Sequence, residues 1–132
     1  MPTAARAAVG TPYGSGGNGP SSFDCSGLTV HAFKQAGVSL PRTSFAQYGQ
    51  GSRIDRSQIQ AGDLVFFGPD GKRTKRGHIS HVGIALGGGW MIHSSGSRGG
   101  VSISNLETYW TEGTAFARRP PAFAAPAART PV

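Results

Sequence analysis

The chain begins with helical periodicity and changes to strand-like alternation from about residue 63 onward. One face of the clearest helical pattern recurs at spacings of three and four, on Leu28, Thr29, Ala32, Phe33 and Ala36. This pattern predicts a helix that begins at Cys25, where Asp24 or Ser22 can cap the first turn, and that ends at Gly37. The start of this helix therefore carries the only cysteine of the chain.

Two shorter helices and one loop complete the first half of the chain. An Ala-rich helix is predicted over residues 3–9, and another from Thr43 or Ser44 to about Tyr48. Residues 11–22 are dense in glycine, which predicts an irregular loop leading into the main helix.

The second half is predicted to form a sheet. Short β-rich segments, separated by Gly-rich or charged turns, occupy residues 63–67, 80–86, 90–94, 101–104 and 114–119. Helices packed on a mainly antiparallel sheet of five to six strands define an α+β domain, which we expect to span residues 1–119. Residues 120–132 are rich in proline and alanine and predict a flexible tail.

Composition narrows the class of protein. With 132 residues, 37% of them apolar, the chain suits one domain with one core, and 21 glycines with 9 prolines exclude a coiled coil. A formal charge of +7 favours polyanionic surroundings, but no nucleic-acid or zinc-ligand motif accompanies it, so nucleic acid is not an expected partner. Residues 1–10 contain no apolar run long enough for a signal peptide or a membrane span.

Cys25 is the candidate nucleophile. A lone cysteine is often a small buried hydrophobe, but Cys25 has polar or small neighbours and lies at the predicted first turn of a helix. The unpaired N–H groups and positive dipole end at that position would stabilise a thiolate and lower the pKa of the thiol. The backbone N–H of Cys25 is also a candidate donor to an oxyanion on the carbon that sulfur attacks.

The base for this nucleophile has to come from four histidines. His31 lies on another face of the Cys25 helix, and His78 follows the cationic segment KRTKRG, so neither is an expected catalyst. His81 opens a strand in which bulky and small side chains alternate, and the small face leaves room for a substrate. We expect His81 to be the base, against the alternative of a histidine bonded to a backbone carbonyl at a strand edge.

Strand register links His93 to His81. A three-residue hairpin loop over 87–89 would pair Leu86 with Trp90, Ile84 with Ile92, and Gly83 with His93. His81 and His93 would then share a face within reach of a ring-to-ring hydrogen bond, whereas a two-residue loop would put them on opposite faces. The first register is favoured because it gathers the bulky residues on the core side: Val82, Ile84, Leu86, Trp90 and Ile92. It predicts an acyl-transfer triad of Cys25, His81 and His93.

Five segments follow one another along the chain: FDCSGL, LPRTSFAQ, GDLVFF, HVGIALGGG and MIH. Together they resemble the NlpC/p60 family of cell-wall cysteine peptidases, from Thr11 to about Arg119. The resemblance implies a papain-like fold and a peptidoglycan endopeptidase. Such an enzyme cuts the γ-D-glutamyl–diaminopimelate or lysine bond of the stem peptide without a cofactor or metal. It is expected to be secreted, periplasmic or associated with the cell wall, by an export route that this chain does not show.

The resemblance also implies a substrate pocket lined by Tyr13, Asp24, Ser26 and Ser44, with Asp24 facing the free amino end of L-alanine. The long basic segment 69–80 is less typical of the family and is expected to be a solvated loop or a lid that binds wall phosphates. Partners that stay open are anionic wall polymers and an inhibitory or immunity protein. A monomer is the default expectation.

Two rival functions stay open at this point. An amidase or acyltransferase on the same scaffold would use the same nucleophile, base and oxyanion donors. A non-catalytic wall-binding module would keep the fold without turnover, although retention of Cys25, His81 and His93 weighs against that reading.

Overall fold

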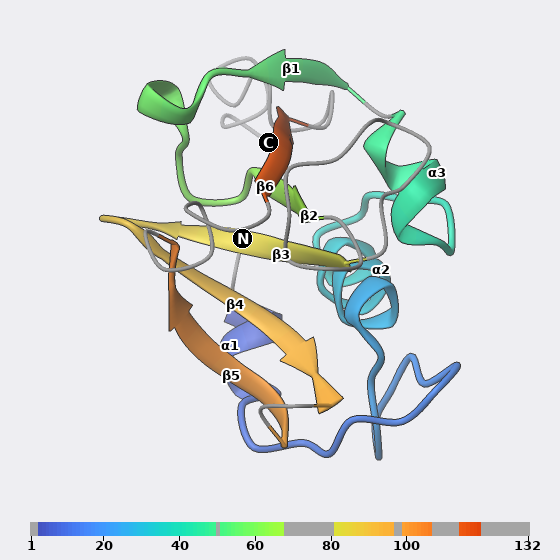
Figure 1. The fold of residues 1–132 in the computed structure, drawn as a ribbon. Helices are drawn as coiled ribbons and strands as arrows, with labels where there is room; N and C mark the ends of the chain where they lie inside the picture. The colour runs from blue at the N-terminus through green and yellow to red at the C-terminus, as the bar shows by residue number, and fades with distance from the viewer. Residues whose placement is uncertain (1–2, 50, 68–80, 97–98, 107–113, 120–132) are drawn as a thin grey trace.

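The computed structural model describes residues 3–49, 51–67, 81–96, 99–106 and 114–119 (Figure 1). Its elements are α1 (Thr3–Ala7), α2 (Cys25–Gln35), α3 (Ser44–Tyr48), β1 (Ser52–Ile54), the 3-10 turn η1 (Arg56–Gln58), β2 (Leu64–Phe67), β3 (His81–Gly87), β4 (Trp90–Ser95), β5 (Gly100–Asn105) and β6 (Thr114–Arg119). The predicted α+β class, with helices first and strands after them, is confirmed. The periodicity does not predict β1 or η1, because runs of three residues carry no readable alternation.

The strands form one six-stranded sheet in the order β1-β6-β2-β3-β4-β5 (Figure 1). Every neighbouring pair is antiparallel, so the mainly antiparallel sheet predicted from the sequence is confirmed. The last strand, β6, lies between β1 and β2, and the strands that carry the candidate histidines, β3 and β4, are neighbours near the other end.

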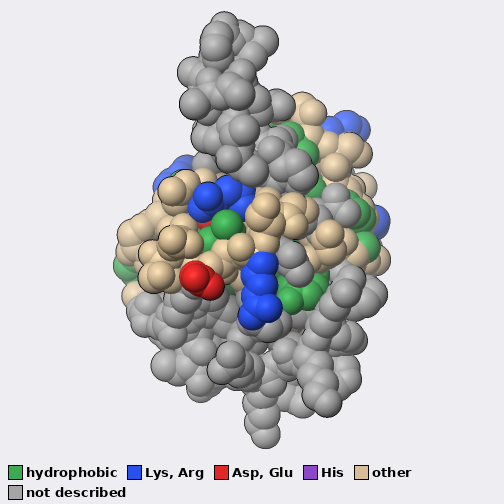
Figure 2. Space-filling view, turned by 90° about the horizontal axis from the view of Figure 1, so that it is seen from above, with side chains coloured by type: hydrophobic (Ala, Val, Ile, Leu, Met, Phe, Trp, Pro, Cys, Tyr) green, Lys and Arg blue, Asp and Glu red, His purple; other side chains and the backbone are tan. Residues whose placement is uncertain are grey.

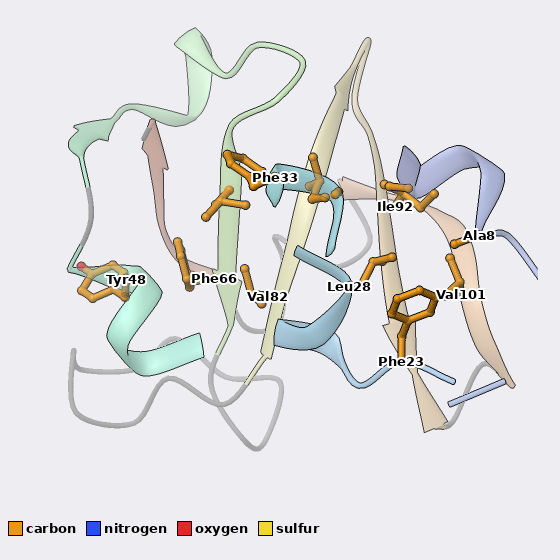
Figure 3. Close-up of a cluster of buried hydrophobic side chains, with 13 residues drawn as sticks. Ala8, Phe23, Leu28, Phe33, Tyr48, Phe66, Val82, Ile92 and Val101 are labelled. Carbon is orange, nitrogen blue, oxygen red and sulfur yellow. The ribbon is translucent and has the colours of Figure 1, made fainter. Parts of the chain in front are cut away.

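The main core lies between the helices and one face of the sheet. Helix α2 packs on β3 and β4, with α1 beside it. Figure 3 shows side chains of this core that come from the helices, the sheet and the segments next to α1 and α2: Ala8, Phe23, Leu28, Phe33, Tyr48, Phe66, Val82, Ile92 and Val101. Burying one large apolar side chain contributes about 1.5–3 kcal/mol, so this layer fixes the position of α2 on the sheet.

A smaller apolar cluster covers the opposite face of the sheet, with Val65, Phe67, Ala85, Met91 and Leu106 as its buried members. Strand β2 therefore has buried side chains on both faces, which explains why its sequence reads as a continuous apolar run. Just before β2, the buried Asp63 carboxylate accepts hydrogen bonds from Nε and Nη2 of Arg119, at 2.8 and 3.0 Å. This ion pair fixes the end of β6 against the start of β2.

The hairpin between β3 and β4 differs in part from the prediction. Ile84 pairs with Ile92 as expected, but Gly87 takes the place of Leu86 opposite Trp90. The loop has only the two residues between Gly87 and Trp90, and a β-bulge at Leu86 absorbs the extra residue. Because the bulge lies on the loop side of the Ile84–Ile92 pair, His81 and His93 still share a face. Trp90 was predicted to lie in the core, but 46% of it is exposed.

Candidate active site

A side-chain cap and a close glycine contact build the start of α2. The backbone of Asp24 is extended, and its Oδ1 accepts a hydrogen bond from the N–H of Gly27 at 2.6 Å, which confirms the predicted cap. A Cβ at Gly27 would overlap the carbonyl oxygen of Gly17, so only glycine allows the loop to pack this closely. Cys25 is the first residue of the helix, as predicted, and it is half-buried.

Arg42 is a part of this site that the sequence reasoning missed. Its Nη1 donates to Oδ1 of Asp24 at 3.1 Å, and its Nη2 donates to Oδ2 at 2.9 Å. The same guanidinium donates to Oγ of Ser26 at 2.8 Å and to the carbonyl oxygen of Gly17 at 3.3 Å. Arg42 lies in the segment LPRTSFAQ, and a signal was present in its basic side chain beside a proline that precedes a capped helix.

Buried Gln47 joins α3 to the start of α2. Its Nε2 donates to the carbonyl oxygens of Pro41 and Ser26, at 2.8 and 3.2 Å, and its Oε1 accepts from Oγ1 of Thr29 at 2.6 Å. Because Pro41 directly precedes Arg42, this network also fixes the backbone from which the Arg42 side chain reaches Asp24.

The predicted pocket residues have different surroundings. Ser26 is buried beside Asp24 and Arg42, and Ser44 is buried at the first position of α3. Tyr13 is 43% exposed, and burial raises the pKa of its phenol, helped by the charges of Cys25 and Asp24 nearby. The structure thus brings Tyr13, Asp24 and Ser26 together around Cys25.

The two strand histidines form a hydrogen-bonded chain across the sheet. Nε2 of His81 lies 2.8 Å from Nδ1 of His93, and Nε2 of His93 lies 2.8 Å from Oγ of Ser104. Gly83 makes room for this arrangement, since a Cβ there would lie 3.3 Å from Cβ of His93 and 2.8 Å from the sulfur of Met91. The predicted ring-to-ring contact is therefore present, and Ser104 extends it to β5.

The start of α2, with Cys25, lies against the start of β3, whose first residue is His81. A backbone hydrogen bond from Val82, the residue after His81, acts on the thiol of Cys25. Nε2 of His81 is engaged with His93, so Nδ1 is the ring nitrogen that this contact does not use.

Burial governs the ionisation of both groups. It raises the pKa of the Cys25 thiol, and it lowers the pKa of His81 to about 4 from the ordinary 6.5. Backbone hydrogen bonds to the thiol from Val82, Ser26 and Cys25 itself act in the opposite direction, but they do not outweigh burial. The predicted lowering of the Cys25 pKa is therefore wrong for the free protein, in which the neutral thiol and neutral imidazole are favoured.

The remaining histidines have other positions. His31 packs its ring against Phe23, with ring centroids 5.0 Å apart, as expected for a packing residue. His78 lies outside the described residues, as do the whole of the segment 69–80 and the predicted tail 120–132. Within the described ranges, no group of three or more His, Cys, Asp or Glu side chains is arranged to hold a metal ion. No helix in this part of the chain is long and apolar enough to cross a bilayer.

On the face drawn in Figure 2, the basic side chains of the described residues are separate from one another. Figure 2 shows blue Lys and Arg side chains divided by tan and green surface, with acidic side chains in red among them. On this face, the described residues therefore lack the continuous basic track typical of a nucleic-acid groove.

A half-buried cysteine at a helix start, beside a histidine pair on an antiparallel sheet, defines an α+β domain with a cysteine-peptidase type of site. Comparison with known families identifies the family to which this domain belongs. Residues 10–119 match the NlpC/P60 family, and the chain belongs to that family. The resemblance carried by the five sequence segments is thereby confirmed.

Individual relatives agree with this assignment. The chain is 49% identical over 98 residues to the probable endopeptidase p60 of Listeria monocytogenes, covering 74% of this chain and 19% of p60. It is 44% identical over 107 residues to the bifunctional muramidase/DL-endopeptidase CwlT of Bacillus subtilis, covering 78% of this chain and 30% of CwlT. The chain thus spans less than a third of either relative.

A solved structure supports the fold. The crystal structure of the NlpC/p60 domain of the peptidoglycan hydrolase SagA superposes with a TM-score of 0.76 at 35% identity, covering 88% of this chain and 92% of that domain. The NlpC/P60 fold predicted from the sequence is therefore confirmed.

Proposed function

We propose that this domain is a peptidoglycan hydrolase, a cysteine endopeptidase that cuts the γ-D-glutamyl–diaminopimelate or lysine bond of the stem peptide. The observation that carries the proposal is the position of Cys25 at the start of α2, against the strand that begins with His81. The relatives support the substrate class, because SagA is a peptidoglycan hydrolase and CwlT is a DL-endopeptidase. The proposed bond joins a D residue to an L centre.

The acylation step follows from the favoured protonation states. Nδ1 of neutral His81 accepts the thiol proton of Cys25 as sulfur attacks the γ-carbonyl carbon of the D-glutamyl residue. Proton transfer coupled to attack generates the thiolate when it is needed, so a raised pKa of the thiol does not prevent catalysis. The backbone N–H of Cys25 donates to the developing oxyanion.

Collapse of the tetrahedral intermediate breaks the C–N bond. The proton on His81 passes to the leaving amine, and the γ-D-glutamyl group remains as a thioester on Cys25. Water then attacks the thioester with His81 again as base, the C–S bond breaks, the proton on His81 returns to the sulfur of Cys25, and the product leaves as a γ-carboxylate. His93 orients the imidazole of His81 through the 2.8 Å ring-to-ring contact.

The substrate side of the site is assigned to Tyr13, Asp24, Ser26 and Ser44. The pKa of the Tyr13 phenol, ordinarily 10.0, is raised further by burial, so its hydroxyl is protonated at neutral pH and can donate to a substrate carbonyl or carboxylate. Asp24 and Ser26 already bond Arg42, so these groups form a pre-organised polar wall beside Cys25. Since peptidoglycan lies outside the cytoplasmic membrane, the domain is proposed to act there.

Mass spectrometry of stem peptides and intact peptidoglycan, after incubation with wild type and Cys25→Ala, tests the function. New fragments ending at γ-D-glutamate from wild type alone would support both the bond and the nucleophile. Release of the glycan from L-alanine would favour an amidase. Equal binding of peptidoglycan by both proteins, with no new fragments from either, would favour a wall-binding module.

Two further variants test the remaining roles. We expect His81→Ala to lose nearly all turnover, because the thiol then has no base, and His93→Ala to lose less, because only orientation is removed. Lys34 lies exposed in the last turn of α2, so Lys34→Ala serves as a control with unchanged turnover. Full activity of His81→Ala would rule out its role as base.

A further inference from the structure

Ser104 lies at the far end of the histidine chain, on β5. Its hydroxyl oxygen is 2.8 Å from Nε2 of His93, and both residues are buried, with exposed fractions of 7% and 0%. The β4–β5 register pairs His93 with Ser102 and Met91 with Ser104, so both serines share the face of His93. Of the two serines, Ser104 bonds the ring, whereas the buried Oγ atom of half-buried Ser102 has no hydrogen-bond partner among the described residues.

The ring-to-ring contact allows two arrangements of protons when both imidazoles are neutral. In the first, His81 donates from Nε2 to Nδ1 of His93, and Nε2–H of His93 donates to Ser104. In the second, Ser104 donates to Nε2 of His93, and Nδ1–H of His93 donates to Nε2 of His81. His81 then carries its own proton on Nδ1. Only the first leaves a lone pair on Nδ1 of His81 to accept a proton from Cys25.

Protonation of His81 removes this ambiguity. When His81 has taken the thiol proton, both of its nitrogens carry hydrogens, so its Nε2 has to donate to Nδ1 of His93. His93 then carries its own proton on Nε2, and the oxygen of Ser104 is the acceptor that it meets at 2.8 Å. Without that oxygen, a buried N–H would lose this acceptor in the state where His81 is charged.

We propose that Ser104 is a positioning residue of this active site, whose hydroxyl oxygen accepts the Nε2 proton of His93 and so keeps Nδ1 of His81 free for the thiol. This inference rests on the proposed function, since it assumes that His81 is the base. Ser104 acts through two rings and does not touch the substrate. The hydroxyl is needed more in the charged state than in the resting state, so its effect falls on kcat rather than on KM.

The chain offers a matched control. Ser104→Ala removes the bonded hydroxyl, whereas Ser102→Ala removes, from the same strand and the same face, a hydroxyl without a partner in the described part of the chain. Ser104→Thr restores a hydroxyl at the bonded position. Circular dichroism measures the folded fraction of each variant.

Nitrogen-15 NMR of the histidine rings reads the tautomers directly and needs no turnover. In wild type, Ser102→Ala and Ser104→Thr, we expect His93 to carry its proton on Nε2 and to leave Nδ1 bare. In Ser104→Ala, we expect a mixture of both His93 tautomers. An unchanged Nε2–H tautomer in Ser104→Ala would overturn the proposal.

Kinetics on a stem peptide provide the second test. We expect kcat of Ser104→Ala to fall about five- to tenfold at nearly constant KM, the effect of losing one buried hydrogen bond. Ser102→Ala should match wild type, and Ser104→Thr should recover most of the loss. A loss in Ser104→Ala no larger than that in Ser102→Ala, or one matched by its loss of folded protein, would overturn the proposal. Absence of cleavage by wild type would instead refute the proposed function and leave the tautomer test standing.

Discussion

The guanidinium of Arg42 donates to both carboxylate oxygens of Asp24, the residue immediately before Cys25, at 3.1 and 2.9 Å. Asp24 also caps α2 through the N–H of Gly27, and it accepts a hydrogen bond from the N–H of Gly16 in the Gly-rich loop. One carboxylate therefore joins three parts of the site: the helix start, the Gly-rich loop and the segment that leads into α3.

Replacing Arg42 with lysine should impair activity more than stability. Lysine keeps the charge but cannot donate to both oxygens of Asp24 in the same plane. The pair is partly exposed, with side-chain exposures of 39% and 18%, so its loss should cost only about 1 kcal/mol of unfolding free energy. We expect kcat/KM on a stem peptide to fall at least about tenfold, because Asp24 and Ser26 then lose their common partner. Wild-type kinetics in Arg42→Lys would contradict this role.

The hydrogen bonds that the Asp24 carboxylate already accepts limit its ability to bind an amine of the substrate. Its two oxygens accept from the N–H groups of Gly16 and Gly27, from Ser26, and from both Nη atoms of Arg42. Little capacity is therefore left for the L-alanine ammonium that the family resemblance places against Asp24, since a carboxylate offers about four lone-pair sites. We propose that Asp24 lines the pocket by holding Arg42 and Ser26. We expect kcat/KM for a stem peptide with a free L-alanine amine and for its N-acetylated form to agree within a factor of about three. A strict requirement for the free amine would contradict this expectation.

Burial of His81 should shift the acidic limit of activity. The acidic limb of kcat/KM reports the free base, and the pKa of His81 is lowered to about 4, so activity should persist below pH 6.5 and disappear near pH 4. The raised pKa of Cys25 should move the alkaline limb upward. Initial rates on a soluble stem peptide from pH 3 to 10 would measure both limbs. An acidic limb near pH 6.5 would contradict the lowering of the His81 pKa by burial.

The same burial makes stability depend on pH. Because the pKa of His81 is lower in the folded state, protons bind the unfolded chain preferentially as pH falls below 6.5 toward about 4. The folded protein therefore keeps its full stability with respect to His81 above pH 6.5. It loses unfolding free energy as pH falls from 6.5 to about 4. We expect urea unfolding between pH 7 and pH 5 to show a larger loss of stability in wild type than in His81→Gln. Equal losses of stability in the two proteins would show that the pH dependence arises from groups other than His81.

Gly27 tests whether helix propensity or close packing dominates at the nucleophile helix. Propensity alone predicts that Gly27→Ala stabilises α2 by about 1 kcal/mol. The overlap of a new Cβ with the carbonyl oxygen of Gly17 predicts destabilisation by about 2 kcal/mol and loss of turnover. Gly49→Ala is the control, because a Cβ there meets only an ordinary contact at 3.4 Å and φ is −79°. Denaturant unfolding of both variants shows whether Gly27→Ala raises or lowers the unfolding free energy.

Local patterns predicted much of this protein. The helix at Cys25, its cap at Asp24 and the pairing of Ile84 with Ile92 follow from periodicity, capping chemistry and alternation, all of which depend on neighbours in the chain. Because a strand has a period of two residues, the Ile84–Ile92 pair was enough to bring His81 and His93 to one face. The bulge at Leu86 changed the loop without changing that relationship.

Only the tertiary structure decided the contacts between residues that lie far apart in the sequence. The ion pair of Arg42 with Asp24 and the contact of Ser104 with His93 form when separate elements pack, and no local pattern encodes them. The direction of the Cys25 pKa shift was decided in the same way. A helix start lowers the pKa of a thiol, but the sequence cannot show how deeply the sheet and the loop bury it, and here burial has the larger effect.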